Sequence, residues 1–297
     1  MDSGHRCGFV AIVGRPNVGK STLLNCLVGQ KVSITSRRPQ TTRHRIMGIK
    51  TTPAYQVIYV DTPGMHQGRK NAMNRYLNRA ARSAMADVDA LVFVVEGVKW
   101  TDEDDLVLQR LRDIHAPVIL VINKVDQVDK AALLAHIAVL AERMDFAAVV
   151  PLSARSGQNV DALESEVHKR LPPGPPMFPE KQVSDRSDRF LAAELVREKL
   201  TRRLGQELPH ALTVEIDRFR ERNRMVHIDA VIWVEREGQK AIVIGKDGSG
   251  LKIVGQQARH DLERIFGRRV FIRLWVKVKA GWSSDERSLR SLGYKDE

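Results

Sequence analysis

The chain has 297 residues, of which 43% are hydrophobic and 28% charged, a composition typical of a globular protein with an ample core. At about 150 residues per domain, this length predicts one large domain or two ordinary ones. The longest apolar runs, Ala90–Val95 and Pro117–Ile122, are much shorter than the roughly 20 residues of a membrane helix. Lys and Arg (48) exceed Asp and Glu (36) by 12, which favours a polyanionic partner, either nucleic acid or an anionic membrane surface.

The cysteine and histidine content argues against two further classes of protein, those stabilised by disulfides and those that bind zinc. The two cysteines, Cys7 and Cys26, cannot form a disulfide framework and fit a reducing cytosol. The nine histidines are scattered without the spacing of metal ligands, so a zinc site has no support. The amino terminus has no signal-peptide cleavage pattern, and we expect a cytoplasmic protein.

Residues 1–172 are expected to form an α/β domain. Short β-rich apolar runs alternate with helical patterns, which is typical of a mostly parallel sheet covered on both faces. Arg45–Lys50 and Gln56–Asp61 read as a hairpin, which would add one antiparallel strand. The buried strands are predicted at Phe9–Gly14, Gln56–Asp61, Ala90–Glu96, Val118–Lys124 and Ala147–Ser153, and the helices near 20–29, 70–86, 102–114, 129–143 and 160–171.

A proline-rich segment predicts a domain boundary. Five prolines and one glycine among residues 172–179 cannot continue a helix, so residues 173–188 are expected to be an extended linker. The pattern beyond it predicts a small α+β domain over 189–281 and a tail over 282–297. Its elements are expected in the order helix, strand, strand, helix, helix, strand, with the clearest at Phe190–Leu204, Ala211–Arg220, Met225–Glu235, Ser249–Phe266 and Val270–Lys279.

The first strand leads into a phosphate-binding motif. Residues 14–21 match G-x-x-x-x-G-K-[ST] between a strand and a helix, the context that makes this motif believable. Its backbone N–H groups would wrap the phosphates, with Lys20 facing the outer phosphates and Ser21 ligating Mg²⁺. The residues expected to contact phosphate here are Gly14, Arg15, Pro16, Asn17, Val18, Gly19, Lys20 and Ser21.

Three later segments, each after a predicted strand, identify the nucleotide. In Asp61–Gly64 the carboxylate can reach Mg²⁺ through water and the Gly64 N–H can meet the γ-phosphate. A carboxylate at Asp126 can accept from two adjacent guanine donors, a pair that adenine does not offer. We therefore expect phosphate contacts from Asp61, Thr62, Pro63, Gly64 and Met65, and guanine contacts from Asn123, Lys124, Val125, Asp126, Ser153 and Ala154, with a Ser153–Ala154 backbone N–H donating to O6.

These motifs, together with Thr41–Arg43, resemble those of the translation-factor-related GTPases over about residues 6–171. The resemblance implies that a threonine completes the Mg²⁺ site, with Thr42 the better match and Thr41 the alternative. Lys20, Thr42 and Gly64 are then the residues expected to act in hydrolysis. Asn17 resembles the asparagine that ligates a potassium ion in related GTPases. Small signalling GTPases carry a water-orienting glutamine where this chain has Met65, so slow intrinsic turnover is expected.

A second motif lies in the basic carboxy-terminal part. Gly245-Lys246-Asp247-Gly248 is a G-x-x-G loop before a helix, and such loops in KH domains clamp about four nucleotides of single-stranded nucleic acid. Residues 240–281 hold ten Lys or Arg against three Asp or Glu, a local charge of +7. The expected RNA-binding residues are Gly245, Lys246, Asp247, Gly248 and Lys252, and the element order resembles a type II KH domain.

A GTPase domain, a proline-rich linker and one type II KH domain resemble the Era family of GTPases over nearly the whole chain. This resemblance implies a monomeric GTPase that binds the 3′ region of 16S ribosomal RNA, acts in maturation of the small (30S) ribosomal subunit, and associates partly with the inner membrane. The main alternative is a GTP-dependent RNA chaperone or adaptor whose hydrolysis is incidental. A tRNA-modifying GTPase would need a further catalytic domain, and Asp126 disfavours an ATP-using kinase.

Overall fold

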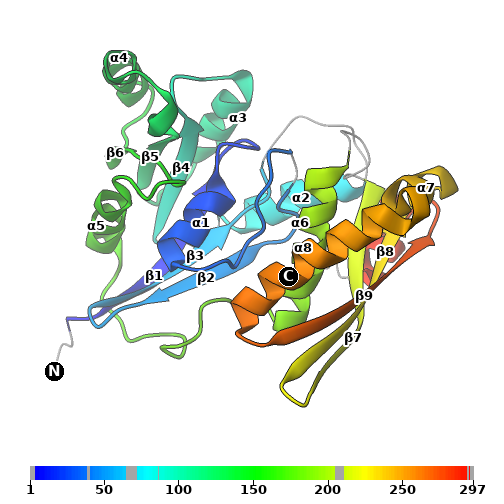
Figure 1. Cartoon of the computed structure of the whole chain (residues 1–297). Coiled ribbons are helices and arrows are strands. Elements are labelled where there is room, and N and C mark those ends of the chain that lie inside the picture. The colour runs from blue at the N-terminus through cyan, green and yellow to red at the C-terminus, as the bar shows by residue number, and fades with distance from the viewer. Residues whose placement is uncertain are drawn as a thin grey trace. The chain divides into compact units, whose positions relative to one another are not determined.

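The computed structural model describes residues 4–38, 41–64, 72–85, 87–204, 211–292 and 294. The chain divides into two compact units (Figure 1). One comprises Met1–Ser33, Thr42–Gly68 and Leu77–Asp185, and the other Ile34–Thr41, Arg69–Tyr76 and Arg186–Glu297. No helix in the described part of the chain is long and apolar enough to cross a membrane.

The first unit is built on a six-stranded sheet in the order β2-β3-β1-β4-β5-β6. All neighbouring strands are parallel except β2 and β3, which form the predicted antiparallel hairpin. The central strands are fully buried because apolar runs such as that of β4 face helices on both sides. The strands are β1 (Arg6–Val13), β2 (Ile46–Thr51), β3 (Tyr55–Asp61), β4 (Ala90–Glu96), β5 (Val118–Asn123) and β6 (Ala148–Pro151).

Among the described residues, four helices, α1 to α4, connect these strands and α5 follows the last strand, each close to its predicted position. Helix α3 begins at a capping box in which Thr101 and Asp104 satisfy each other's backbone N–H groups, and α4 begins at the side chain of Asp129. The helices are α1 (Lys20–Val28), α2 (Ala72–Ser83), α3 (Asp102–Leu111), α4 (Lys130–Ala141) and α5 (Val160–Arg170).

The proline-rich segment after α5 is extended and hydrogen-bonded to the sheet. The buried side chain of Gln56 accepts from the backbone N–H groups of Met177 and Phe178 at 2.7 and 2.9 Å. Farther on, the backbone N–H of Ile49 in β2 donates to the carbonyl of Val183 at 2.9 Å. The segment thus covers the β2 edge of the sheet, and the first compact unit extends through Asp185.

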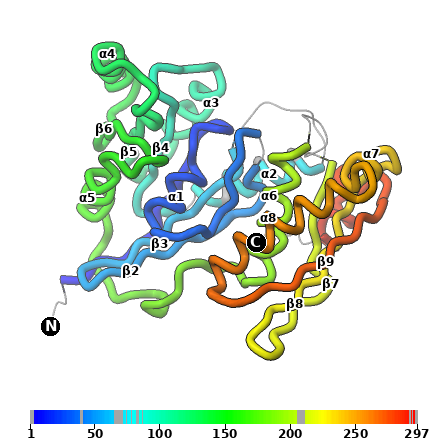
Figure 2. Tube along the Cα trace, in the orientation of Figure 1, coloured from blue at the N-terminus to red at the C-terminus, as the bar shows by residue number. Residues whose placement is uncertain are grey.

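The second unit contains a three-stranded sheet in the order β7-β8-β9, with β7 and β8 antiparallel and β8 and β9 parallel. The element order follows the prediction for the small α+β domain. Helices α6 and α8 cross one face of the sheet, where alternate residues of β9 face the core (Figures 1 and 2). The elements are α6 (Asp188–Arg203), β7 (Leu212–Arg222), β8 (Met225–Val234), α7 (Glu237–Ile244), α8 (Ser249–Phe266), β9 (Arg269–Val278) and α9 (Glu286–Ser291).

Candidate functional site

The P-loop connects the end of β1 to the start of α1. Gly19 adopts φ 105°, and a Cβ there would lie 2.3 Å from the side-chain nitrogen of Asn123, so only glycine fits. The Lys20 ammonium donates to the carbonyls of Gly14 and Arg15 at 2.9 and 2.8 Å. Burial lowers the pKa of Lys20 to about 8. An anionic phosphate at this loop would favour the charged ammonium, because opposite charge offsets the desolvation.

Oxygen ligands suited to Mg²⁺ gather beside the P-loop. The Ser21 hydroxyl donates to Asp61 Oδ2 at 2.7 Å and lies 2.7 Å from the hydroxyl of Thr42. Burial raises the pKa of Asp61, although Lys20 and the neighbouring hydroxyl groups oppose this shift. The second carboxylate oxygen, Oδ1, is buried and has no hydrogen-bond partner among the described residues.

This donor set fits Mg²⁺, a hard cation that takes oxygen ligands and is usually held by one or two carboxylates together with substrate phosphates. In the described ranges, no group of three or more His, Cys, Asp or Glu could hold a metal ion. Of the two candidate threonines, Thr42 has its hydroxyl beside Ser21 and Asp61. The Thr41 hydroxyl instead donates to the carbonyl of Arg38 within its own loop.

Gly64 lies directly against the P-loop. A Cβ at this position would approach the backbone nitrogen of Pro16 to 2.8 Å, so a side chain would displace one of the two segments. Thr62 is buried, and its hydroxyl donates to the carbonyl of Ile12 at 3.0 Å, which fixes the strand end that carries Asp61. Met65 lies outside the described residues, and its expected phosphate contact stays a prediction.

The base-recognition segments are held together by Asn123 at the end of β5. Its Nδ2 donates to the Val18 carbonyl at 2.8 Å, and its Oδ1 accepts from the backbone N–H groups of Lys124 and Ala154 at 2.8 and 2.9 Å. Asn123 therefore joins the P-loop, the N-K-x-D segment and the Ser153–Ala154 segment. A backbone N–H of the Ser153–Ala154 segment was expected to reach guanine O6; in this structure the Ala154 N–H donates to Asn123 and the Ser153 N–H to the Gln158 carbonyl.

Asp126 is exposed beside these segments. A hydrogen bond from the side chain of Ser153 is the main cause that holds the pKa of Asp126 below its ordinary value. The lowered pKa favours the ionised carboxylate, the form that can accept from both guanine donors. Val125, between Lys124 and Asp126, opens a short 3₁₀ turn.

An ion-pair network supports the P-loop, and sequence analysis did not anticipate it. Arg15 donates to Glu96 at 2.9 Å and to the buried carboxylate of Asp104 at 3.0 Å. Lys124 donates to Glu96 and to the Asn17 carbonyl, both at 2.9 Å. Burial alone would raise the pKa of Glu96, but its bonds and charge interactions with Lys124 and Arg15 lower it. The acidic members come from β4 and α3, outside every motif, so pattern matching gives no signal for them.

The G-x-x-G loop connects α7 to α8 in the second unit. Gly245 has φ 73°, and a Cβ there would approach the backbone nitrogen of Gly250 to 2.9 Å. Gly248 has φ 74° with open space around it, and Lys246, Asp247 and Lys252 are exposed. Ile242 and Ile253, on the helices flanking the loop, are 59% and 37% exposed. The loop thus presents backbone, charge and apolar surface together, and the two isoleucines are candidate RNA contacts that the sequence alone did not single out.

Comparison with known proteins follows the same division. Residues 9–124 match the 50S ribosome-binding GTPase family, and residues 207–283 match the KH domain family. GTPase Era of Pseudomonas fluorescens is 58% identical over 292 residues, which span 98% of this chain and 97% of the relative. GTPase Era of Pseudomonas aeruginosa is 56% identical over 297 residues, 100% of this chain and 97% of that one. The chain belongs to the Era family of GTPases.

Solved Era structures share the whole fold. The crystal structure of Era in complex with MgGDPNP and nucleotides 1506–1542 of 16S ribosomal RNA superposes with a TM-score of 0.94 at 38% identity, covering 98% of this chain and 99% of that one. A variant of Aquifex aeolicus Era bound to GDP·AlF₄⁻ gives the same TM-score and identity, with 97% and 99% coverage. The P-loop GTPase domain followed by a KH domain is therefore confirmed as the fold of this Era-family chain.

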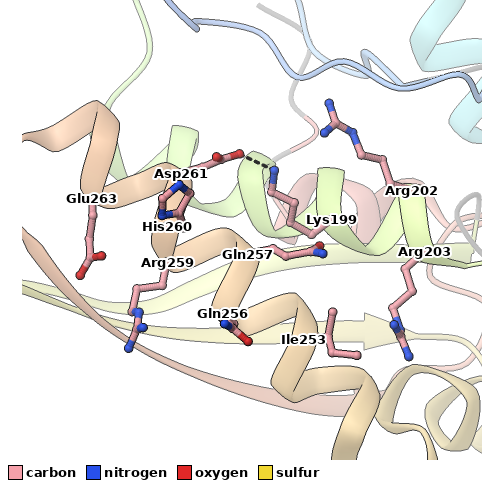
Figure 3. A pocket seen from close by; sticks show the side chains of 10 residues that line it. All are labelled: Lys199, Arg202, Arg203, Ile253, Gln256, Gln257, Arg259, His260, Asp261 and Glu263. Carbon is pink, nitrogen blue, oxygen red and sulfur yellow. Dashed lines mark hydrogen bonds and ion pairs between the residues drawn. The ribbon is translucent and has the colours of Figure 1, made fainter.

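A cavity of about 740 Å³ lies between α6 and α8 (Figure 3). Its clearest internal contact is the ion pair in which Lys199 of α6 meets Asp261 of α8. Lys199 is largely buried and also contacts Glu198, so the pair fastens the two helices. Ile253 is the one candidate RNA contact named above that lines this cavity, which is bounded by Lys199, Arg202, Arg203, Ile253, Gln256, Gln257, Arg259, His260, Asp261 and Glu263.

Proposed function

We propose that this Era-family chain is a GTP-hydrolysing ribosome-assembly factor that binds the 3′ region of 16S ribosomal RNA and couples its GTP state to maturation of the 30S subunit. The supporting observation is the presence of two chemistries in one chain: a P-loop with base-recognition residues, and a KH domain with an open G-x-x-G loop. A related Era was crystallised in complex with MgGDPNP and a fragment of 16S ribosomal RNA. We therefore propose GTP and that region of the RNA as the ligands of this chain.

In the proposed mechanism, Lys20 and the P-loop N–H groups hold the β- and γ-phosphates, while Gly64 offers its N–H to the γ-phosphate. Ser21 and Thr42 would ligate Mg²⁺ directly and Asp61 would act through water; the ion neutralises charge that develops on the phosphates. Asp126 selects guanine. The residue directly after Gly64 is Met65 rather than a water-orienting glutamine, so slow intrinsic turnover is part of the proposal, with Asn17 holding a potassium ion as a substitute source of positive charge.

The proposal includes the location and the oligomeric state of the protein. A cytoplasmic location is supported by the two free cysteines. The family resemblance supports a monomeric state and peripheral association with the inner membrane.

The deciding experiment is a multiple-turnover GTPase assay on the full chain, with and without a 16S 3′-end fragment. We expect RNA to accelerate turnover, and we expect Lys20→Ala to reduce hydrolysis by at least about 100-fold because it removes the charge facing the phosphates. An RNA chaperone with incidental hydrolysis would bind the fragment without any change in turnover, and that result would contradict the proposal.

A further inference from the structure

The face of the β7–β8–β9 sheet opposite α6 and α8 carries an unusual set of side chains. Along β9, the residues pointing away from the core alternate between cations and aromatic rings, and all of them are exposed. We call this series the aromatic strip: Arg269, Phe271, Arg273, Trp275 and Lys277. Because alternate residues of a strand share a face, successive members are about 6.6 Å apart.

The two aromatic rings of the strip are exposed, and an arginine held by an ion pair lies between them. Phe271 is 46% and Trp275 is 41% exposed, which is uncommon for large hydrophobic side chains in the described part of this chain. The Arg273 guanidinium lies between them, 6.0 Å from the Phe271 ring centroid and 5.3 Å from that of Trp275. Asp229 of β8 accepts from Arg273 through two bonds of 2.8 Å, which fixes this guanidinium in place.

The neighbouring strand extends the same surface. Cross-strand partners share a face, and the register places His227 beside Phe271 and Trp233 beside Lys277. The His227 and Phe271 rings are 5.6 Å apart, and the Lys277 ammonium lies 5.7 Å from the Trp233 ring. The aromatic surface therefore extends over both β8 and β9 and is not confined to one strand.

The charge of this face is strongly positive. The register brings three further arginines of β7 to the same side, so the paired positions of this face carry six cations against two acids, Glu215 and Asp229; the exposed Asp217 lies in the bulge between Ile216 and Arg218. The six are Arg218, Arg220, Arg222, Arg269, Arg273 and Lys277. One of the two acids is already neutralised by Arg273, so the remaining cations favour a polyanion.

We propose that the aromatic strip binds single-stranded RNA, with bases stacked on Phe271 and Trp275 and phosphates held by the flanking cations, as a continuation of the RNA held at residues 245–248. Stacking on exposed rings inside a positive surface is how sequence-tolerant single-strand sites work. An exposed sheet can serve as such a platform. The inference rests on the proposed RNA-binding function and adds a second contact surface to it.

Two other occupants fit less well. A membrane surface is bound by helices that gather apolar residues on one side and cations on the other, whereas this strip interleaves them along a strand. Protein interfaces enrich aromatic residues and Arg but deplete Lys and charge at their centre. The interleaved cation-and-ring pattern matches the repeating phosphate and base of a nucleic acid strand.

The test compares two lengths of unstructured RNA on the full chain: a four-nucleotide probe that fits the G-x-x-G loop, and a twelve-nucleotide probe that can extend beyond it. The variants are Phe271→Leu and Trp275→Leu, which keep apolar bulk but remove the ring. We expect each to weaken the longer probe roughly tenfold while leaving the short probe unchanged. Leu134→Ala removes another exposed apolar side chain, on α4, and is the matched control.

Mapping and a lipid control complete the design. Photocrosslinking of a 4-thiouridine form of the longer probe should give adducts on β8 or β9 as well as near the loop. Unchanged affinity for the longer probe in both variants, or adducts confined to 245–252, would overturn the inference. So would loss of binding to phosphatidylglycerol vesicles with RNA affinity intact, which would assign the strip to membranes. Failure of the short probe to bind the unaltered chain would instead contradict the proposed RNA-binding function itself.

Discussion

Asn123 illustrates how much of the nucleotide site depends on a single buried amide. Three hydrogen bonds from its side chain connect the P-loop, the N-K-x-D segment and the Ser153–Ala154 segment. Asp126 makes a contrasting case, because its carboxylate is exposed and faces outward. Asn123 therefore braces the loops, whereas Asp126 is proposed to recognise the base, and substitutions should separate these roles.

Asp126→Asn should change which nucleotide binds. Replacing the carboxylate removes two charge-assisted acceptors for guanine, each worth about 1.5–3 kcal/mol, so GTP affinity should fall by roughly 10²–10⁴-fold. Xanthosine triphosphate should bind better than GTP, because its C2 carbonyl can accept from the new amide. Calorimetric titration with both nucleotides measures the effect.

Asn123→Ala is the matched control for this exchange. It should weaken both nucleotides together and lower the melting temperature, since it leaves the Val18 carbonyl and two N–H groups without their partner. Undiminished GTP affinity in Asp126→Asn would refute the guanine assignment.

The potassium prediction concerns the side chain of Asn17. The backbone carbonyl of Asn17 is held by Lys124 and its φ is 65°, a backbone region that glycine adopts without strain, so Asn17→Gly should leave the loop conformation intact. If the side chain ligates potassium, replacing sodium by potassium should accelerate single-turnover hydrolysis in the unaltered chain and have no effect in Asn17→Gly. Equal hydrolysis rates in the two salts for the unaltered chain would rule out a role for the potassium ion.

At the scale of elements, the G-x-x-G loop and α8 offer a closely matched pair of glycines. Gly248 precedes α8 with φ 74°, and Gly267 follows it with φ 63°, and both have open space around Cβ. Aspartate is among the residues that tolerate this backbone region. An aspartate at either of the two positions should therefore cause similar backbone strain. The two variants differ mainly in how far the new side chain lies along the chain from the G-x-x-G loop.

Gly248→Asp should lower affinity for single-stranded RNA at least tenfold, because it places a negative side chain where the phosphate backbone must pass. Gly267→Asp should bind RNA like the unaltered chain, and GTP hydrolysis without RNA should be similar in both. Filter binding with single-stranded and duplex RNA measures the effect. A preference for duplex, or equal losses in the two variants, would show that the loop is structural.

Elements with strong local patterns were predictable, and contacts between distant segments were not. The β2–β3 hairpin and the six-element order of the KH domain follow from alternation and helical periodicity, and both are confirmed. The Arg15–Glu96 pair and the bond between Ala154 and Asn123 join segments about 80 and 31 residues apart. No periodicity encodes such pairs, because they depend on where the strands end in the folded sheet.

At the scale of the molecule, the proline-rich segment was predicted as a linker and is in fact fastened to the sheet through residue 185. Composition correctly indicated an extended backbone without helix. It could not indicate that Gln56, a polar residue within a buried strand, supplies the partners for that backbone. The domain limits at 172 and 189 remain predictions, and the structure offers a sharper way to test them.

A fragment of residues 1–185 should be more stable than one of residues 1–171. The shorter fragment lacks the three hydrogen bonds of Gln56 and, on β2, the bonds from the N–H groups of Ile49 and Met47 to residues 183 and 185, each worth roughly 1 kcal/mol. We expect a melting temperature lower by at least about 10 °C, together with aggregation through the exposed edge strand. Calorimetry and light scattering compare them, and equal stability would mean that the segment is a linker after all.

The parallel pairing of β8 with β9 also determines when each activity becomes available during synthesis. Met225 pairs with Arg269, 44 residues later, so the KH sheet cannot close until β9 has left the ribosome. The phosphate and base segments are complete once residue 154 has emerged. We therefore expect a nascent chain to load nucleotide before it can hold RNA, and the emergence of β9 to set the moment at which the two ligands first meet on one molecule.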